Sequence, residues 1–144
     1  FSEAPFYGSE IASLVMFAGL ILGTVLNPSM NVNGAGDVLP AIVLSQYVSA
    51  AVGVFLYAGK FEDGGWYATY VPVVSAGPAC VLALGATVPV AVAAGVLGGI
   101  LGGPLAEFFA SLLPEDVHPT VANVASMAAT TSFVYIALAA LPFF

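Results

Sequence analysis

Charged residues are scarce in this sequence: they make up 6% of its 144 residues, while hydrophobic residues make up 60%. A typical soluble domain has roughly 25% charged residues. A soluble protein of this size would leave much of that apolar surface in water, at about 25 cal/mol per Å². The scarcity of charge therefore excludes an ordinary soluble domain, and we expect a protein whose solvent is lipid.

Basic residues are almost missing, because one lysine and no arginine stand against eight acidic residues and give a formal net charge of −7. Nothing in the chain can neutralise a row of phosphates, so nucleic acid is excluded as a partner. Anionic lipid headgroups find no polybasic patch either. The positive-inside rule has only Lys60 to act on, so the sequence does not set the orientation in the membrane.

The chain has one cysteine and one histidine, which leaves little material for metal or thiol chemistry. Cys80 has no partner for a disulfide or a metal site, so we interpret it as an apolar packing residue. His118 precedes Pro119 in a polar loop and is interpreted as a helix-start residue, with a metal or proton role as the alternative. We find no GxSxG, HExxH or phosphate-loop motif and no intramembrane nucleophile beside a base. The sequence predicts a protein that is not an enzyme and uses no cofactor or metal.

Long apolar runs are what the sequence has instead, and a membrane-spanning helix needs roughly 20 mostly apolar residues. The first run, Ile11 to Leu26, is barely long enough. It is stopped by Asn27-Pro28, because the residue before a proline disfavours helical geometry. The second run extends from about Val38 to Gly59, with Asp37 placed as its N-cap.

Residues 60–67 hold several of the chain's few charges, two glycines and the aromatic pair Trp66 and Tyr67, which is typical of the headgroup level, so they predict a surface loop. The apolar stretch that follows, residues 67–113, is too long for one crossing. The expected turn between a third and a fourth segment is Gly85 to Pro89, and prolines at 72 and 78 interrupt the third. The Gly-Gly-Pro sequence at 102–104 is expected to kink or break the fourth segment. A polar loop then leads to a fifth segment at 121–141.

These segments predict an all-α fold: a polytopic integral membrane protein whose single transmembrane domain, residues 1–144, is a bundle of about five helices with Pro/Gly-interrupted segments. Four or six crossings are the alternatives, if part of residues 71–113 enters the membrane and returns. The domain is either the whole protein or one part of a larger membrane protein. Five crossings would leave Asp37 alone on one face and gather the other charged loop residues on the opposite face: Glu3, Glu10, Lys60, Glu62, Asp63, Glu115 and Asp116.

Glycines recur at four-residue spacing in two of these segments. Gly95, Gly99 and Gly103 form one row, and Gly19 and Gly23 form another. Small residues four apart give a flat helix face on which a second backbone can approach closely. We expect these faces to pack helices together, either inside one subunit or between subunits of a homo-oligomer.

Polar side chains within the apolar segments are candidates for a binding site, because in lipid each must find a partner or line a wet cavity. Gln46 lies in the second segment beside two serines, at 45 and 49. Asn123, Ser126 and Thr130 share one helical face of the fifth segment. Glu107 follows the expected break, where the first turn of a half-helix would favour a carboxylate. The alternatives are back-bonded hydroxyl groups and an interfacial position for Glu107.

The stretch from Asn27 to Pro40 holds three asparagines, two glycines, two prolines and one aspartate. Interrupted helices of this kind bind substrates and ions in many secondary transporters. The sequence NPSMNV here and HPTVANV before the fifth segment suggest a weak inverted repeat. An ordinary loop is the alternative, since the same residue types form turns. The neutral composition favours a segment that enters a cavity.

We therefore expect a transport protein or transporter subunit of the cell membrane, which moves a small solute or ion along a path lined by interrupted helices. The alternative is a non-transporting assembly subunit that packs through its glycine faces, as a homo-oligomer or with partner membrane subunits. The predicted substrate-binding residues are polar or acidic side chains of the interrupted stretch and of the second, fourth and fifth segments: Asn27, Asn31, Asn33, Asp37, Gln46, Glu107, Asn123, Ser126 and Thr130.

Overall fold

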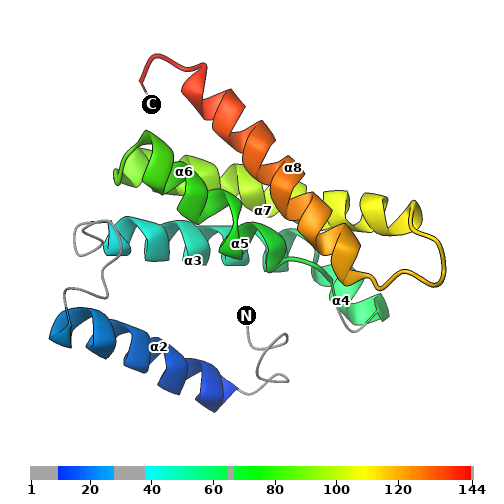
Figure 1. Ribbon diagram of the computed structural model, residues 1–144, viewed down its shortest axis with the longest axis horizontal. Coiled ribbons are helices and arrows are strands. Elements are labelled where there is room, and N and C mark those ends of the chain that lie inside the picture. Colours follow the sequence, from blue (N-terminus) through cyan, green and yellow to red (C-terminus); the bar gives the residue numbers. More distant parts are fainter. Residues whose placement is uncertain (1–9, 28–37, 65–66, 144) are drawn as a thin grey trace. The chain divides into compact units, whose positions relative to one another are not determined.

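The computed structural model describes residues 10–27, 38–64 and 67–143, and every regular element in those ranges is a helix (Figure 1). The chain divides into two compact units, Phe1–Leu39 and Pro40–Phe144, here called unit 1 and unit 2. Several predicted positions lie outside the described residues: Glu3, Pro28, Asn31, Asn33, Asp37 and Trp66.

Unit 1 contains α2 (Glu10–Leu26), a helix of 17 residues that covers the predicted first segment. At 1.5 Å per residue it is about 25 Å long, somewhat less than the roughly 30 Å hydrocarbon thickness of a bilayer. The backbone N–H of Asn27 donates to the carbonyl of Gly23 at 3.0 Å, which closes the last turn. Within this unit, a Cβ atom added at Gly19 or Gly23 would meet nothing within 4 Å.

Unit 2 is a bundle of helices that run in alternate directions. Its elements are α3 (Leu39–Leu56), whose first residue belongs to unit 1, α4 (Ala58–Gly64), α5 (Val71–Val74), α6 (Ala76–Leu84), α7 (Val88–Ser111) and α8 (Thr120–Ala139). Figure 1 shows α3 and α7 running in one direction and the α5–α6 pair and α8 running in the other. Among the described residues, three helices are long and apolar enough to cross a membrane: α3, α7 and α8.

The region after α3 differs from the prediction, because residues 58–64 form the short helix α4 and not a loop. Its charged side chains, Lys60, Glu62 and Asp63, are nevertheless exposed. Its seven residues make about two helical turns, and none of them is buried. The predicted surface position is therefore correct, while the predicted conformation is wrong.

The third segment is interrupted as predicted. Helix α5 ends at Val74, α6 begins at Ala76, and Ser75 between them has φ −127° and ψ −80°. Pro78 has no backbone N–H, so the carbonyl of Val74 lacks its helical donor. The expected turn is also present: Gly85 has φ 121°, which favours glycine, and α7 starts at Val88.

The predicted break at Gly-Gly-Pro does not occur, because α7 continues for 24 residues from Val88 to Ser111 with Pro104 inside it. A proline at 104 removes the N–H that would bond to the carbonyl of Ile100. The hydroxyl of Tyr57, from the end of α3, donates to that carbonyl at 2.5 Å. A hydroxyl from the end of α3 thus supplies a donor to this carbonyl, and the helix continues past the proline.

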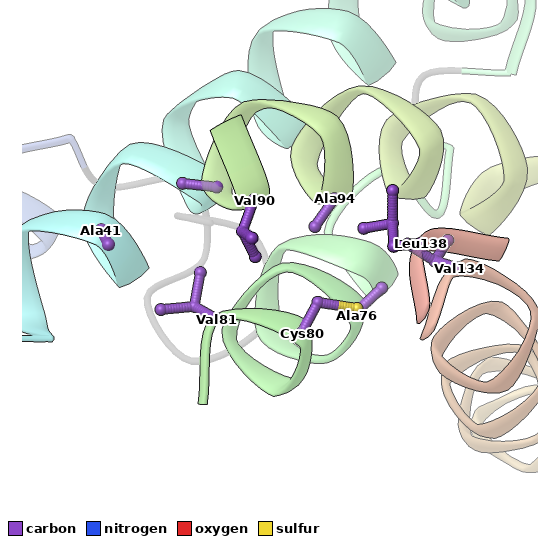
Figure 2. Close-up of a cluster of buried hydrophobic side chains, with 9 residues drawn as sticks. Ala41, Ala76, Cys80, Val81, Val90, Ala94, Val134 and Leu138 are labelled. Atoms are coloured by element: carbon purple, nitrogen blue, oxygen red, sulfur yellow. The ribbon is translucent and has the colours of Figure 1, made fainter. Parts of the chain in front are cut away.

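The interior of unit 2 is built from small residues. Figure 2 shows Ala41 of α3, Cys80 of α6, Ala94 of α7 and Val134 of α8 in one buried cluster. Cys80 is fully buried there, in agreement with its interpretation as a packing residue. The outer surface carries large apolar side chains, among them Phe55 with 82% of its surface exposed, as expected for helices that face lipid.

The glycine row of α7 packs inside the chain. A Cβ added at Gly95 would lie 2.8 Å from the carbonyl oxygen of Ser45, and one at Gly99 would lie 2.8 Å from that of Ser49. These glycines let α3 approach α7 closely. Gly103 instead faces the ring of Tyr67, whose Cε1 atom would lie 2.5 Å from an added Cβ. All three glycines of this row thus lie at close contacts within unit 2, two of them with α3.

Candidate site at the charged end of the bundle

A surface pocket of about 420 Å³ lies at one end of unit 2. Figure 1 shows that α4, the C-terminal end of α7 and the start of α8 meet at this end. The lining residues come from these elements and from the chain segment before α5: Lys60, Asp63, Gly64, Tyr67, Ala68, Ala106, Glu107, Ala110, Pro119 and Asn123. We call this cavity the Lys60–Glu107 pocket.

An ion pair crosses the pocket. The Nζ atom of Lys60, from α4, lies 2.7 Å from Oε1 of Glu107, on α7. The two side chains are 49% and 53% exposed. An ion pair with this exposure contributes only about 0–1 kcal/mol to stability. The ion pair can therefore break and re-form at a small cost in free energy.

Tyr67 holds the other oxygen of the carboxylate. Its hydroxyl donates to Oε2 of Glu107 at 2.9 Å. The Nζ atom of Lys60 lies 5.6 Å from the centre of the Tyr67 ring, within the range of a cation–π interaction. The ammonium group of Lys60 is therefore held by one carboxylate and one aromatic ring.

The Tyr67 side chain is buried, and its ring lies 5.2 Å from the ring of Tyr57 at an interplanar angle of 54°. Gly103 makes room for it, as the Cβ distance given above shows. Burial raises the pKa of the Tyr67 hydroxyl far above its ordinary value of 10.0, and the hydrogen bond to Glu107 raises it further. The hydroxyl thus remains a donor throughout the neutral range.

The sequence predicted that Glu107 lies in the first turn of a half-helix, and this position is wrong. It lies near the C-terminal end of α7, because that helix continues through Pro104. The negative end of a helix dipole disfavours a carboxylate. The Lys60 ammonium and the Tyr67 hydroxyl are what stabilise its charge.

The polar face of α8 starts at this pocket and continues inward. Asn123 lines the pocket, and the hydroxyl of the buried Ser126 donates to the carbonyl of Gly102 at 2.8 Å. Thr130 is fully buried, and its hydroxyl has no hydrogen-bond partner within the described part of the chain. From Asn123 to Thr130 the helix rises about 10 Å, so the three side chains extend from the pocket into the bundle.

The remaining predicted binding residues do not belong to this pocket. Gln46 lies partly buried on α3, away from the lining residues. Asn27 belongs to unit 1. Of the neighbouring serines, Ser45 bonds back to the carbonyl of Ile42 at 2.7 Å, which was the alternative interpretation, and Ser49 is buried without a partner in the described ranges. His118 accepts from the N–H of Thr120 at 3.2 Å, as a helix-start residue does.

Lys60, Tyr67 and Tyr57 are the site residues that sequence reasoning missed. Lys60 and Glu107 are 47 residues apart in the chain, and no spacing pattern connects them. The one available signal was that the single basic residue must find an acidic partner if it lies near lipid.

Comparison of the chain with protein-family models, with curated protein sequences and with solved structures finds no match.

Proposed function

We propose that this chain is a transport protein of the cell membrane, or one part of a larger transporter, and that it takes a small solute or ion in through the Lys60–Glu107 pocket. The observation that carries the proposal is the continuity between the pocket and the polar face of α8. A hydroxyl buried among apolar helices without a partner costs about 1–3 kcal/mol. The Thr130 hydroxyl would be satisfied by water or solute that passes along this face.

The proposal includes five crossings of the membrane. The helices α3, α7 and α8 are long enough individually, and the α5–α6 pair forms a shorter apolar segment, Val71–Leu84. Helix α2 supplies the fifth crossing. An interrupted helix such as α5–α6, beside a path for solute, is a common feature of secondary transporters.

Thiol accessibility tests the path. In a Cys80→Ala background, single cysteines replace Asn123, Ser126 and Thr130, and reconstituted protein is labelled with a membrane-impermeant thiosulfonate. We expect all three to react, more slowly with depth, because water reaches them from the pocket. The control is a cysteine at Val134, which is buried in the apolar cluster one turn beyond Thr130. Transport is contradicted if positions 126 and 130 are as inert as position 134.

The alternative function is a non-transporting assembly subunit, and the open glycine face of α2 is the observation that favours it. Gly19 and Gly23 have free space beside them within unit 1, so a helix of a second copy or of a partner subunit can pack there. Replacing both by leucine would then abolish association in cross-linking experiments. In the transport proposal the same change leaves association unaffected.

A further inference from the structure

We infer that the Lys60–Glu107 pocket is a binding site for a small organic ammonium ion, and that the Lys60 side chain is a tethered occupant of that site. This inference names the solute class of the proposed transport function. The ammonium of Lys60 rests on Oε1 of Glu107 at 2.7 Å and lies 5.6 Å from the centre of the Tyr67 ring. A carboxylate and an aromatic face are the two groups that proteins use to recognise alkylammonium ions.

The tethered ammonium can be exchanged for a free one. Both partners of the ion pair are about half exposed, so the pair is weak and water reaches it. Lys60 lies on the seven-residue helix α4 and has a flexible stem. Glu107 stays fixed, because Tyr67 holds its second oxygen. When Lys60 swings out, a formed cation site remains.

The pocket walls fit the rest of such an ion. Ala68, Ala106 and Ala110 form an apolar part of the lining, and Asp63 and Asn123 provide further oxygen atoms. A short alkyl chain can contact the alanines while its ammonium group lies at Glu107. With about 420 Å³, the pocket has room for several heavy atoms next to the displaced lysine.

The charges around the pocket favour a cation over an anion. Lys60 is the only lysine or arginine of the chain, whereas two of the residues that line the pocket, Asp63 and Glu107, are acidic. Such a field concentrates cations and repels anions. A carboxylate or phosphate ligand for Lys60 would have to approach against this field and displace Glu107.

Calorimetric titration of the purified 144-residue chain in detergent with ethylammonium chloride tests the site. Lys60→Met removes the tethered ammonium and keeps an unbranched stem. Because the wild-type site is mostly occupied by Lys60, we expect the variant to bind ethylammonium roughly fivefold more tightly. Adding Glu107→Gln to Lys60→Met should abolish binding, while Glu62→Gln, outside the pocket lining, should not change it. Propionate, the anionic isostere, should not bind to any of these proteins.

Two results would overturn the inference. One is equal or weaker ethylammonium binding by Lys60→Met when its helical circular dichroism and thermal unfolding match the wild type. The other is binding that survives Glu107→Gln. Flux in proteoliposomes separates this inference from the proposed transport function. Glu107-dependent binding without ethylammonium flux leaves the cation site standing and contradicts transport. Flux of a neutral solute that Glu107→Gln does not change supports transport and contradicts the cation site.

Discussion

At the residue scale, the absence of a side chain at Gly95 and Gly99 sets how closely α3 and α7 approach. An added Cβ at either position would lie 2.8 Å from a backbone oxygen of α3, and backbone cannot move aside as a flexible side chain can. In lipid, where apolar side chains gain nothing by leaving water, this close approach is a main source of helix association. The two glycines therefore determine packing and have no direct contact with the pocket.

Gly99→Ala should destabilise the protein by about 1–3 kcal/mol, because the added methyl group forces the two helices apart. The measurement is unfolding by SDS in mixed micelles. Gly59→Ala is the matched control, since a Cβ at this helical position would meet nothing within 4 Å. It should be neutral or stabilising by up to about 1 kcal/mol. Equal effects of the two changes would show that α3 and α7 do not touch at Gly99.

Tyr67 gives a prediction of pH dependence at the same scale. Its pKa in the folded protein lies above the ordinary 10.0, first because of burial and then because of Glu107. The folded state therefore retains this proton after the unfolded state has lost it. The stability that Tyr67 contributes is complete below pH 10 and decreases as pH rises above it.

Ultraviolet titration of tyrosinate checks this prediction. The difference between the wild type and Tyr67→Phe should show no tyrosinate signal at pH 10 to 11 while the protein is folded, and the signal should appear on unfolding. A difference spectrum that titrates near pH 10 in the folded protein would mean that Tyr67 is neither buried nor bonded to Glu107.

At the element scale, a helix break lies beside one proline and not beside another. Pro78 accompanies a break at Ser75, between α5 and α6, whereas Pro104 lies inside the continuous α7. Each proline leaves a carbonyl without its helical donor. At Ile100 the Tyr57 hydroxyl replaces that donor. We therefore expect the continuity of α7 to depend on Tyr57, which lies on another element.

A double-mutant cycle tests this dependence. Tyr57→Phe should cost about 0.5–1.5 kcal/mol, because the carbonyl of Ile100 loses its side-chain donor. In a Pro104→Ala background the same change should cost much less, since position 104 then carries a backbone N–H of its own. The two effects are compared by SDS unfolding. Strict additivity would mean that the hydroxyl does not compensate for the proline.

At the scale of the whole molecule, the charges of unit 2 gather at one end of the bundle. The acidic residues of α4, those of the loop before α8, Lys60 and Glu107 lie there (Figure 1). Charged side chains in a membrane protein need water or partners. Such a concentration indicates that this end faces an aqueous phase, while Gly85 and the turn around it lie at the opposite end.

Labelling from each side of reconstituted vesicles tests the number of crossings. If α5–α6 and α7 each cross once, as the proposal requires, then in a Cys80→Ala background cysteines at Gly59 and Glu115 should react from one side and a cysteine at Ala86 from the other. With five crossings, a cysteine at Glu3 reacts from the same side as one at Gly59. If Ala86 shares a side with Gly59, the α5–α6 segment enters the membrane and returns.

The sequence alone determined the helical class, the membrane-compatible lengths of α3, α7 and α8, the interruption near Pro78 and the turn at Gly85. These features follow from composition and from the backbone chemistry of single residues, which act locally. The flat glycine face of α7 is also a local feature, since four-residue spacing alone indicates it. The spacing did not indicate which helix would pack there.

Only the tertiary structure decided the rest. The carbonyl that Pro104 leaves without a helical donor accepts from Tyr57, and Glu107 pairs with Lys60, 47 residues earlier in the chain. The register of α4 against α7 brings these groups together. The sequence indicated that Glu107 and Asn123 are polar groups that need partners. It placed Glu107 at the start of a helix, whereas the structure places it near the C-terminal end of α7. Local chemistry determines which groups need partners, and the packing of distant segments determines which partners they meet.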